Sequence, residues 1–473
     1  MNFKKFLYPK NYLQYAKKRL CRTVKSQKNE TKKQTVSYKY IVCDARELFF
    51  QQKKENKFNR YDIIVRYLAI ENFYEKNDFG FDLYKKMQIN RVGNGRGEKS
   101  TEKFKELIYS YEKNGYDSSS EIELYADLHL IDGSHRIALA LYHEIYEISC
   151  KVRSDVVNIF YGIEWFIEKG FSVEEIKKIQ EKYEEIVDNI TVPFVCTLWS
   201  PVQNYFDEIT EKLSLVTKVV DYRDYSFDDY TYSAMVKGIY AVDDIADWKI
   251  DMKIDKMQSN APKKMRMILL NIGNPVFRLK SSNDSTLSST CEVLKKMIRN
   301  AYKDKVENYF HDTIMHIGDN YHQNIFIRNL FNVSIDVNDN KMNLLMYLDN
   351  YIERGIINKN DICIVGSYIM ENAGLRKAND IDIVCRKNIR ENLKIPFNRA
   401  VKLNENVEMV TYGWAAFMGI IDDELIDDEK YHTYVDGYKI ANLDILKQKK
   451  LYTLREKDIL DLALLGIKIN NKK

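Results

Sequence analysis

Two aspartates that flank a single isoleucine are the strongest candidates for chemistry in this 473-residue chain. If the run "NDIDIV" forms a β-strand, Asp380 and Asp382 lie on one face and Ile381 and Ile383 on the other, because side chains alternate along a strand. Two neighbouring carboxylates repel each other, and a cation between them relieves the repulsion. Mg²⁺ prefers such oxygen ligands. The spacing therefore predicts a Mg²⁺ site, and the alternative is a strand with a solvated polar face.

The segments on either side add parts to this site. The apolar run in "ICIVGS" predicts a strand that ends at Gly366 and Ser367, and "YIMENAGL" predicts the helix that follows. The N–H groups at the start of that helix would face a phosphate, and glycine allows close approach to the backbone. In "NVEMV", Glu408 alternates with apolar residues, so a neighbouring strand would bring a third carboxylate. Three carboxylates with one or two metal ions can activate a hydroxyl and neutralise a leaving pyrophosphate.

This series of residues resembles the nucleotidyltransferase superfold, whose signature is an apolar strand ending in Gly-Ser, a helix, Asp-x-Asp and a later acid. The resemblance implies that Gly366 and Ser367 face the nucleotide phosphates. It also implies that Asp380 and Asp382 are catalytic metal ligands and that Glu408 is the third acid. The expected cofactor is Mg²⁺, and the expected substrate is an NTP, either ATP or CTP.

The run "GLRKANDIDIV" is similar to a small bacterial branch of this superfold that includes antitoxin-type and antibiotic-modifying members. It suggests Arg376 and Lys377 as phosphate-binding residues. The tail "REKDILDLALL" is also similar to that branch, in which a helix bearing lysine and arginine follows the sheet. The resemblance covers residues 341–473 and leaves the acceptor open, and some members of the superfold bind nucleotides without turning them over.

A second turn of this kind lies in "LHLIDGSHRIALALYH", where a predicted strand meets a predicted helix at Gly133. Arg136 offers a planar fork for phosphate oxygens, and Asp132 can hold a metal or accept a proton. Ser134 and His135 complete the candidate phosphate site. The alternative is helix capping, in which Asp132 or Ser134 satisfies the first N–H groups of the helix.

The run that leads into this turn resembles the ParB/sulfiredoxin-like fold, in which a helix, a strand and a short hairpin precede a phosphate-binding Gly-x-x-Arg turn. Ser134 stands where sulfiredoxin needs a cysteine, so sulfiredoxin chemistry is excluded. The Asp-Gly-x-His-Arg form is closer to the free-serine-kinase branch. The resemblance implies a nucleotide-binding or small-molecule kinase domain in which Asp132, His135 and Arg136 handle phosphate.

The chain is too long for one hydrophobic core, and its pattern changes predict a multidomain protein of α/β and α+β class. The predicted segments are a basic N-terminal arm (1–37), a ParB/sulfiredoxin-like domain (38–150), a helical linker (151–191), an α/β domain of unknown role (192–335) and a nucleotidyltransferase-like domain (341–473).

The middle block concentrates the histidines His311, His316 and His322. His311, His316 and Asp319 could bind a metal, but their spacing matches no specific ligand motif. Capping of a helix by Asp319 and Asn320 is the favoured explanation, with a phosphate or sugar pocket as the alternative. The residues suggested for an anion in this block are Lys249, Lys253, Arg278 and Lys280.

Composition restricts the partners and the compartment. The net charge is only +4, so no stable nucleic-acid partner is predicted. The seven cysteines are scattered without a C-x-x-C pair, which favours a reducing cytoplasm. No apolar run approaches the roughly 18 residues of a membrane span. The oligomeric state is left open.

These features together predict Mg²⁺-dependent transfer of NMP to a small-molecule acceptor, with a nucleotide-binding or kinase domain in the same chain. Synthesis of surface-polysaccharide precursors is one pathway in which such a pair of domains would serve. Two alternatives stay open: a regulatory or defence protein that modifies a protein or a tRNA, and a nucleotide sensor without catalysis.

Overall fold

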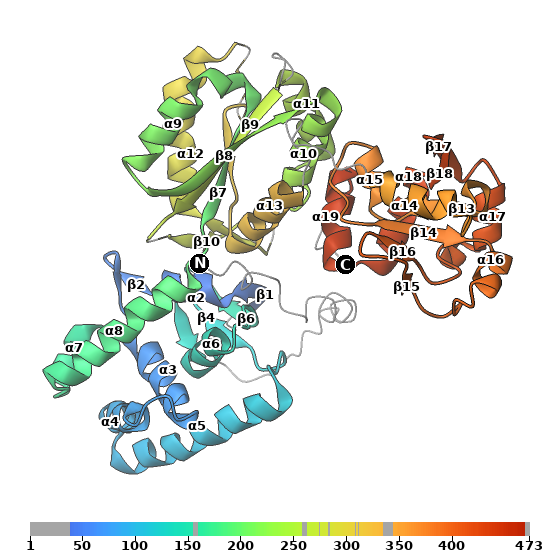
Figure 1. Ribbon diagram of the computed structural model, residues 1–473. Helices are drawn as coiled ribbons and strands as arrows, with labels where there is room; N and C mark the ends of the chain where they lie inside the picture. Colours follow the sequence, from blue (N-terminus) through green and yellow to red (C-terminus); the bar gives the residue numbers. More distant parts are fainter. Residues whose placement is uncertain are drawn as a thin grey trace, which may run out of the picture.

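The chain forms three bodies, each built on its own sheet, in the computed structural model (Figure 1). Mixed helix and strand in several small sheets confirm the coarse prediction of a multidomain α/β protein. The basic arm at residues 1–37 and Cys21 lie outside the described residues. The structure describes residues 38–154, 159–257, 263–273, 275–281, 284–307, 309–310, 312–333 and 344–468.

The N-terminal body has a four-stranded sheet in the order β1-β6-β4-β5. Its elements are β1 (Tyr38–Asp44), α2 (Ala45–Gln51), β2 (Lys53–Lys54), β3 (Lys57–Phe58), α3 (Tyr61–Phe73), α4 (Gly80–Val92), α5 (Asn94–Asn114), β4 (Ile122–Leu124), β5 (Leu130–Asp132), α6 (Ser134–Tyr142), β6 (Glu147–Arg153), α7 (Ile163–Glu168) and α8 (Val173–Ile190). Buried and partly exposed residues alternate along β6, as expected for a strand with one face on the core. A capping box between Ser172 and Glu175 starts α8.

The middle body is a four-stranded sheet in the order β12-β7-β9-β8, and every pairing in it is antiparallel. Its elements are β7 (Phe194–Leu198), η3 (Ser200–Tyr205), α9 (Phe206–Ser214), β8 (Lys218–Phe227), α10 (Asp229–Tyr240), α11 (Asp247–Lys256), β9 (Lys263–Asn271), β10 (Phe277–Leu279), β11 (Thr286–Ser288), α12 (Ser289–Tyr302), η4 (Lys303–Lys305), β12 (Met315–Ile317) and α13 (Tyr321–Val333). The five residues of β7 are all buried because both faces of the sheet are covered. Cys196 packs in the core on the side of α9 and α12, and Val195 in the core on the side of α10.

The C-terminal body has a six-stranded mixed sheet in the order β15-β16-β14-β13-β18-β17. Its elements are α14 (Leu345–Glu353), η5 (Lys359–Asp361), β13 (Ile362–Val365), α15 (Tyr368–Asn372), β14 (Ile381–Cys385), α16 (Lys387–Asn392), β15 (Val401–Lys402), β16 (Val407–Met409), η6 (Ala416–Met418), α17 (Asp422–Asp427), β17 (His432–Val435), β18 (Tyr438–Ala441), α18 (Leu443–Thr453) and α19 (Glu456–Leu464). The central strand β13 is buried throughout, which explains its unbroken apolar run.

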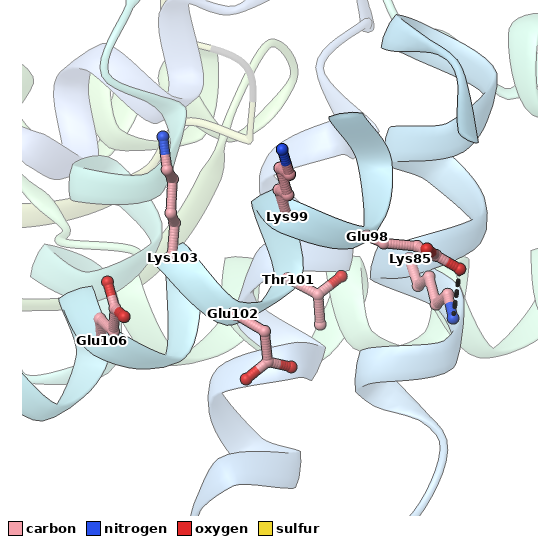
Figure 2. A pocket seen from close by; sticks show the side chains of 7 residues that line it. All are labelled: Lys85, Glu98, Lys99, Thr101, Glu102, Lys103 and Glu106. Carbon is pink, nitrogen blue, oxygen red and sulfur yellow. Dashed lines mark ion pairs between the residues drawn. The ribbon is translucent and has the colours of Figure 1, made fainter. Parts of the chain in front are cut away.

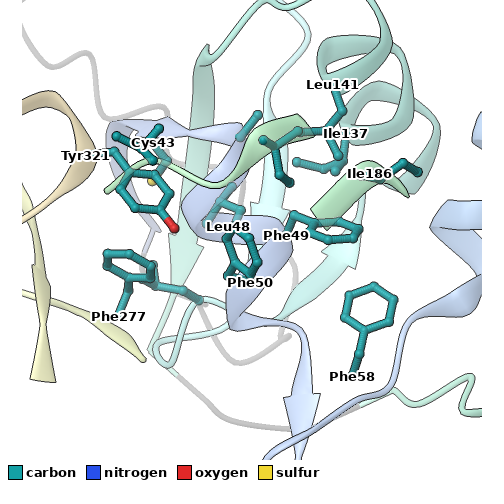
Figure 3. Packing of buried hydrophobic residues seen from close by; sticks show 14 of the residues in the cluster. Cys43, Leu48, Phe49, Phe50, Phe58, Ile137, Leu141, Ile186, Phe277 and Tyr321 are labelled. Carbon is teal, nitrogen blue, oxygen red and sulfur yellow. The ribbon is translucent and has the colours of Figure 1, made fainter. Parts of the chain in front are cut away.

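The N-terminal and middle bodies share one hydrophobic core (Figure 3). Phe50 of α2 meets Tyr321 of α13 edge to face, with ring centroids 6.2 Å apart, and Phe277 of β10 packs on the same tyrosine at 5.5 Å. Glu47 of α2 joins the two bodies: its Oε1 accepts from the Tyr321 N–H at 2.7 Å, and its Oε2 lies 2.5 Å from the Thr286 hydroxyl. The two bodies therefore bury a carboxyl group between them.

The middle and C-terminal bodies meet where α10 packs against α19 (Figure 1). Ala463 and Leu464 of α19 belong to the same core cluster as Val236 and Ile239 of α10. The Thr231 hydroxyl adds a hydrogen bond of 3.0 Å to a carbonyl oxygen of the other body.

Glu47 gives a first prediction, on pH and stability. Burial, reinforced by the charge of Asp44, raises the pKa of Glu47 to about 8. The unfolded glutamate titrates near about 4.3, so the free energy of unfolding should fall by up to about 1.4 kcal/mol per pH unit as the pH rises from about 4.3 to about 8. Glu47→Gln, which stays neutral, should remove this contribution when unfolding is followed by urea denaturation across that range.

The exposed Glu106 of α5 offers a matched control, and Glu106→Gln should keep the wild-type pH profile. Identical profiles for the wild type and Glu47→Gln would contradict a protonated Glu47 at this interface.

The structure shows the state of the described cysteines and the apolar character of the described helices. Among the described residues the cysteines are free and buried, namely Cys43, Cys150, Cys196, Cys291, Cys363 and Cys385. In the same part of the chain, no helix has the length and apolar character needed to cross a membrane.

Candidate functional site

The three predicted acids of the C-terminal body meet at the centre of its sheet. Asp382 on β14 is the register partner of Val365 on β13 and of Glu408 on the parallel strand β16. Asp380 comes directly before β14, two residues ahead of Asp382. The side chains of the register pair therefore lie next to each other on one face, as the alternating pattern predicted.

Carboxylate oxygens of Asp380, Asp382 and Glu408 all lie within 4.8 Å of one another, and each residue is partly exposed. This confirms that the predicted acids converge. Three hard oxygen donors with solvent access are a donor set that suits Mg²⁺, which keeps several of its waters. Metal binding itself stays a prediction.

Gly366 makes room for this cluster. Its φ is +71°, which favours glycine, and a Cβ at this position would lie 2.1 Å from Oδ2 of Asp382. Ser367 follows and precedes α15 without a side-chain cap bond. The helix itself has only five residues and ends before the "AGL" of the predicted segment, so it contributes little dipole to this turn. The close approach of Gly366 to the carboxylate is thus the stronger feature of the Gly-Ser pair.

The charge of the cluster changes the acidity of Asp382. Burial, together with the negative charges of Asp380 and Glu408, raises the pKa of Asp382 to about 6. Arg455 and Lys457 act in the opposite direction. A bound cation would favour the ionised form of this carboxyl, because its charge offsets the repulsion.

Arg455 and Lys457, at the start of α19, were not among the residues predicted from the sequence, although the helix was noted. Arg455 is held by Asp458, with its Nε 2.8 Å from Oδ2, and this bond together with the charge of Asp382 raises its pKa. The pair puts positive charge beside the acids. Its only signal in the sequence is "REK" at the start of an amphipathic helix, far from the aspartates along the chain.

Arg376 has protein partners in the structure. Its Nε and Nη2 bind Asp461 of α19 at 2.5 and 3.3 Å, and Nη1 donates to the Lys377 carbonyl. The Glu371 carboxylate accepts from the Ala378 N–H at 2.6 Å in the same loop. Arg376 therefore fixes the loop before β14 to α19. A contact of Arg376 or Lys377 with phosphate stays a prediction.

The residues of the N-terminal turn are bound within their own body. Gly133 has a φ of +114°, and the exposed Asp132 accepts from its N–H at 2.8 Å. Ser134 accepts from Arg60 Nη2 at 2.7 Å, and Nε2 of His135 lies 2.8 Å from the hydroxyl of a buried tyrosine. Arg136 donates to the Glu121 carbonyl. No side chain caps α6, so these residues do not act as the predicted N-cap. Their contact with phosphate stays a prediction.

Arg60, which binds Ser134 of this turn, belongs to a group of buried charges around Asp62. Asp62, fully buried, pairs with Arg60 at 2.8 Å and Arg66 at 2.9 Å. Burial opposes the charge of Asp62, but these arginines and Arg91 lower its pKa overall. The Nε atoms of Arg66 and Arg91 are buried without a hydrogen-bond partner among the described residues. Burial also lowers the pKa of Arg66 to about 10. Two guanidinium groups thus share one carboxylate, and the charge of Arg91 acts on the same carboxylate, which leaves an excess of positive charge.

In the middle block, the structure confirms helix capping by Asn320 but not by Asp319. Asn320 caps α13 by accepting from the Gln323 N–H at 2.9 Å, as expected. The Asp319 carboxylate does not cap the helix but pairs with Lys280 and Lys295. His316 is buried on β12, while His311 lies outside the described residues. Of the other suggested residues, Lys253 pairs with Asp312, Arg278 pairs with Glu292, and Lys249 lies 5.4 Å from the Trp248 ring.

A pocket of about 500 Å³ lies between α4 and α5 (Figure 2). Its walls carry both signs of charge, including an ion pair of 3.3 Å between Lys85 and Glu98. Balanced, solvated charges of this kind indicate no particular ligand.

Comparisons with protein-family models, curated proteins and solved structures find no match to this chain.

Proposed function

We propose that the C-terminal body transfers NMP from an NTP to a small-molecule acceptor in a Mg²⁺-dependent reaction. The observation that carries this proposal is the convergence of Asp380, Asp382 and Glu408 within 4.8 Å, with Gly366 against Asp382. The three acids would hold the ion, which supplies neutralisation of the leaving pyrophosphate and activation of the acceptor hydroxyl.

The reaction forms a bond between the acceptor oxygen and the α-phosphorus and breaks the bond from that phosphorus to the bridging oxygen. Pyrophosphate leaves with the electrons of that bond. The acceptor hydroxyl, activated by the ion, would lose its proton to water, while the cation would keep Asp382 ionised as a ligand. Arg455 and Lys457 would attract the triphosphate, and Gly366 lets the Asp382 carboxylate approach the end of β13 closely.

For the N-terminal body we propose nucleotide binding. Here the supporting observation is the pair Arg60 and Arg66 that share Asp62, with Arg91 nearby and with the Nε atoms of Arg66 and Arg91 unpartnered among the described residues. One guanidinium group can bind a phosphate through two parallel N–H···O hydrogen bonds. The turn at Gly133, before α6, is joined to Arg60 by the hydrogen bond from Arg60 Nη2 to Ser134. If the N-terminal body also phosphorylates a small molecule, Asp132 would accept the proton of its hydroxyl or hold a metal ion.

The test is incubation of the full chain with Mg²⁺, α-labelled ATP or CTP and a pool of hydroxyl-bearing metabolites. Label in a small product supports the proposal. Label in a protein or tRNA supports the regulatory alternative instead, and binding without turnover supports a sensor. Genomic neighbourhood would guide the choice of acceptors.

Asp380→Ala should abolish the labelling, since it removes one of the three ligands. Glu391→Gln, at an exposed carboxylate of α16, should retain it. If labelling survives Asp380→Ala and is lost in Asp132→Ala, the chemistry belongs to the N-terminal body and the proposal is wrong.

Arg66→Lys tests the N-terminal assignment separately. Lysine keeps the positive charge but lacks the Nε–H that is unpartnered in Arg66, so affinity for a non-hydrolysable ATP analogue should fall about tenfold. Equilibrium dialysis in an Asp380→Ala background keeps the C-terminal reaction out of the measurement. Unchanged affinity would show that the arginine cluster serves the fold alone.

A further inference from the structure

The middle body contains a group of buried polar atoms that lack hydrogen-bond partners among the described residues. Their side chains come from β7, α10, α12 and β12 and from the residue after β7. Buried polar groups are normally paired, so such a group calls for an explanation. The atoms are Thr197 Oγ1, Trp199 Nε1, Tyr240 OH, Arg299 Nε and His316 Nε2.

Four of these side chains, all except that of Arg299, adjoin one another on the face of the sheet that α10 covers. Arg299 belongs to α12 on the other face, and its Nη2 reaches the edge strand β12, where it donates to the Met315 carbonyl at 2.9 Å. Thr197 and His316 are register partners on β7 and β12, and Trp199 follows two residues later on the same side as Thr197. The Tyr240 ring bridges the group, with centroids 6.2 Å from Trp199 and 4.9 Å from His316. The four side chains on this face therefore form one group, and Arg299 lies beside it at the edge strand β12.

Ion pairs stand at both ends of β12, the edge strand of this sheet. Before the strand, Asp312 lies 2.7 Å from both Lys253 and Arg299. After it, Asp319 lies 2.6 Å from Lys280 and 3.0 Å from Lys295. Both acids are thus neutralised by cations from different helices and loops.

The charge of this edge is positive. One further carboxylate, Asp243, lies 3.6 Å from Lys280 and accepts from a glutamine at 2.8 Å. With it, four cations face three carboxylates. Burial, reinforced by Lys295, lowers the pKa of His316 to about 3, so the imidazole is neutral and adds no charge.

The chemistry of the unpartnered atoms identifies the missing partner. Indole and guanidinium N–H groups only donate, the two hydroxyls can donate, and a neutral imidazole can donate from Nε2. A metal ion could bind the imidazole and the two hydroxyls but not the indole or guanidinium N–H groups, so it would leave these two unsatisfied. An anion with several oxygens can accept from all of them. A carboxylate has two oxygens, whereas a phosphate group brings three and suits five donors better.

We propose that this edge of the middle body is a binding site for the phosphate group of a small molecule. Its donors are the five unpartnered groups, and Lys253, Lys280, Lys295 and Arg299 supply the positive surroundings. The side chains of Arg299 and Asp312 are 17% and 23% exposed, so a ligand reaches the cluster from the side of these two residues. The site is independent of the proposed nucleotidyl transfer, because none of its residues belongs to the C-terminal body.

The experiment uses the full chain labelled with 5-fluorotryptophan and inorganic phosphate as the probe. The chain has four tryptophans, and Trp199→Phe assigns the ¹⁹F signal of Trp199. Titration with phosphate at constant ionic strength, set with chloride, should move this signal saturably. Acetate at the same ionic strength should move it far less. A Trp199 signal that shows no saturable response to phosphate would overturn the proposal.

Two conservative variants decide whether the cluster is the site. Tyr240→Phe removes one hydroxyl and Arg299→Lys removes one N–H donor without loss of charge, and each should weaken phosphate binding about tenfold or more. Tyr232→Phe is the control on the same helix, because the Tyr232 hydroxyl is buried but already accepts from the Ser200 N–H. It should leave phosphate affinity unchanged. Equal affinities in all three variants would show that solvent alone satisfies the cluster.

Discussion

Asp382→Asn is expected to abolish nucleotidyl transfer and, at neutral pH, to stabilise the metal-free protein. The asparagine retains the shape of Asp382 but cannot carry the negative charge that would hold Mg²⁺ with Asp380 and Glu408. Loss of several kcal/mol of charge stabilisation corresponds to a rate lower by about 10³-fold or more. The measurement is the initial rate with α-labelled NTP.

The gain in stability follows from the raised pKa. In the folded chain the carboxyl of Asp382 titrates near 6, against about 3.9 in the unfolded chain. The folded state therefore holds its proton more tightly, and the free energy of unfolding falls as the pH rises from about 3.9 to about 6. At pH 7 the ionised carboxylate costs about 3 kcal/mol, and Asp382→Asn should recover this amount in urea denaturation.

Mg²⁺ makes the two effects separable. It should raise the melting temperature of the wild type, with a larger rise at pH 7 than at pH 5, and leave Asp382→Asn unaffected. Asp444→Asn, at an exposed aspartate of α18, should match the wild type in rate and stay within about 0.5 kcal/mol in stability. A wild type that gains nothing from Mg²⁺ at pH 7 would contradict a metal site at these acids.

The three acids could be predicted from the sequence because their signals are local. Alternation with isoleucine and valine fixes the face of Asp382 and of Glu408, and the pairing of β14 with β16 then brings the two together. Whether Arg455 and Lys457 lie near the acids depends on where α19 packs, and no local pattern in the sequence encodes that position. Arg376 shows the same limit, since its partner Asp461 lies 85 residues further along the chain.

The α/β character predicted for residues 192–335 agrees with the strands and helices of the middle body. The direction of the strands does not follow from that pattern. Alternating strands and helices are typical of a parallel sheet, yet β7, β9 and β12 pair antiparallel. The ion-pair partners of Asp319 could not be predicted from the sequence either, because Lys280 and Lys295 lie 39 and 24 residues before it along the chain.

Gly366→Ala is expected to disable the same site without any change of charge. A methyl group at this position would lie 2.1 Å from the Asp382 oxygen, so either the carboxylate or the strand end must move. The φ of +71° adds a backbone cost of about 1–2 kcal/mol for a non-glycine residue. A displacement of about 1 Å in a catalytic group can lower a rate about 100-fold, which is the loss expected in the labelling assay.

Gly419→Ala separates the contact from the backbone strain. Gly419 has nearly the same φ, +77°, but no atom lies within 4 Å of the place that a methyl group would take there, so only the backbone cost should appear. Both variants should then lose stability, while only Gly366→Ala loses nucleotidyl transfer and the stabilisation by Mg²⁺. If Gly366→Ala transfers NMP as fast as Gly419→Ala, the close approach of Gly366 to Asp382 has no part in catalysis.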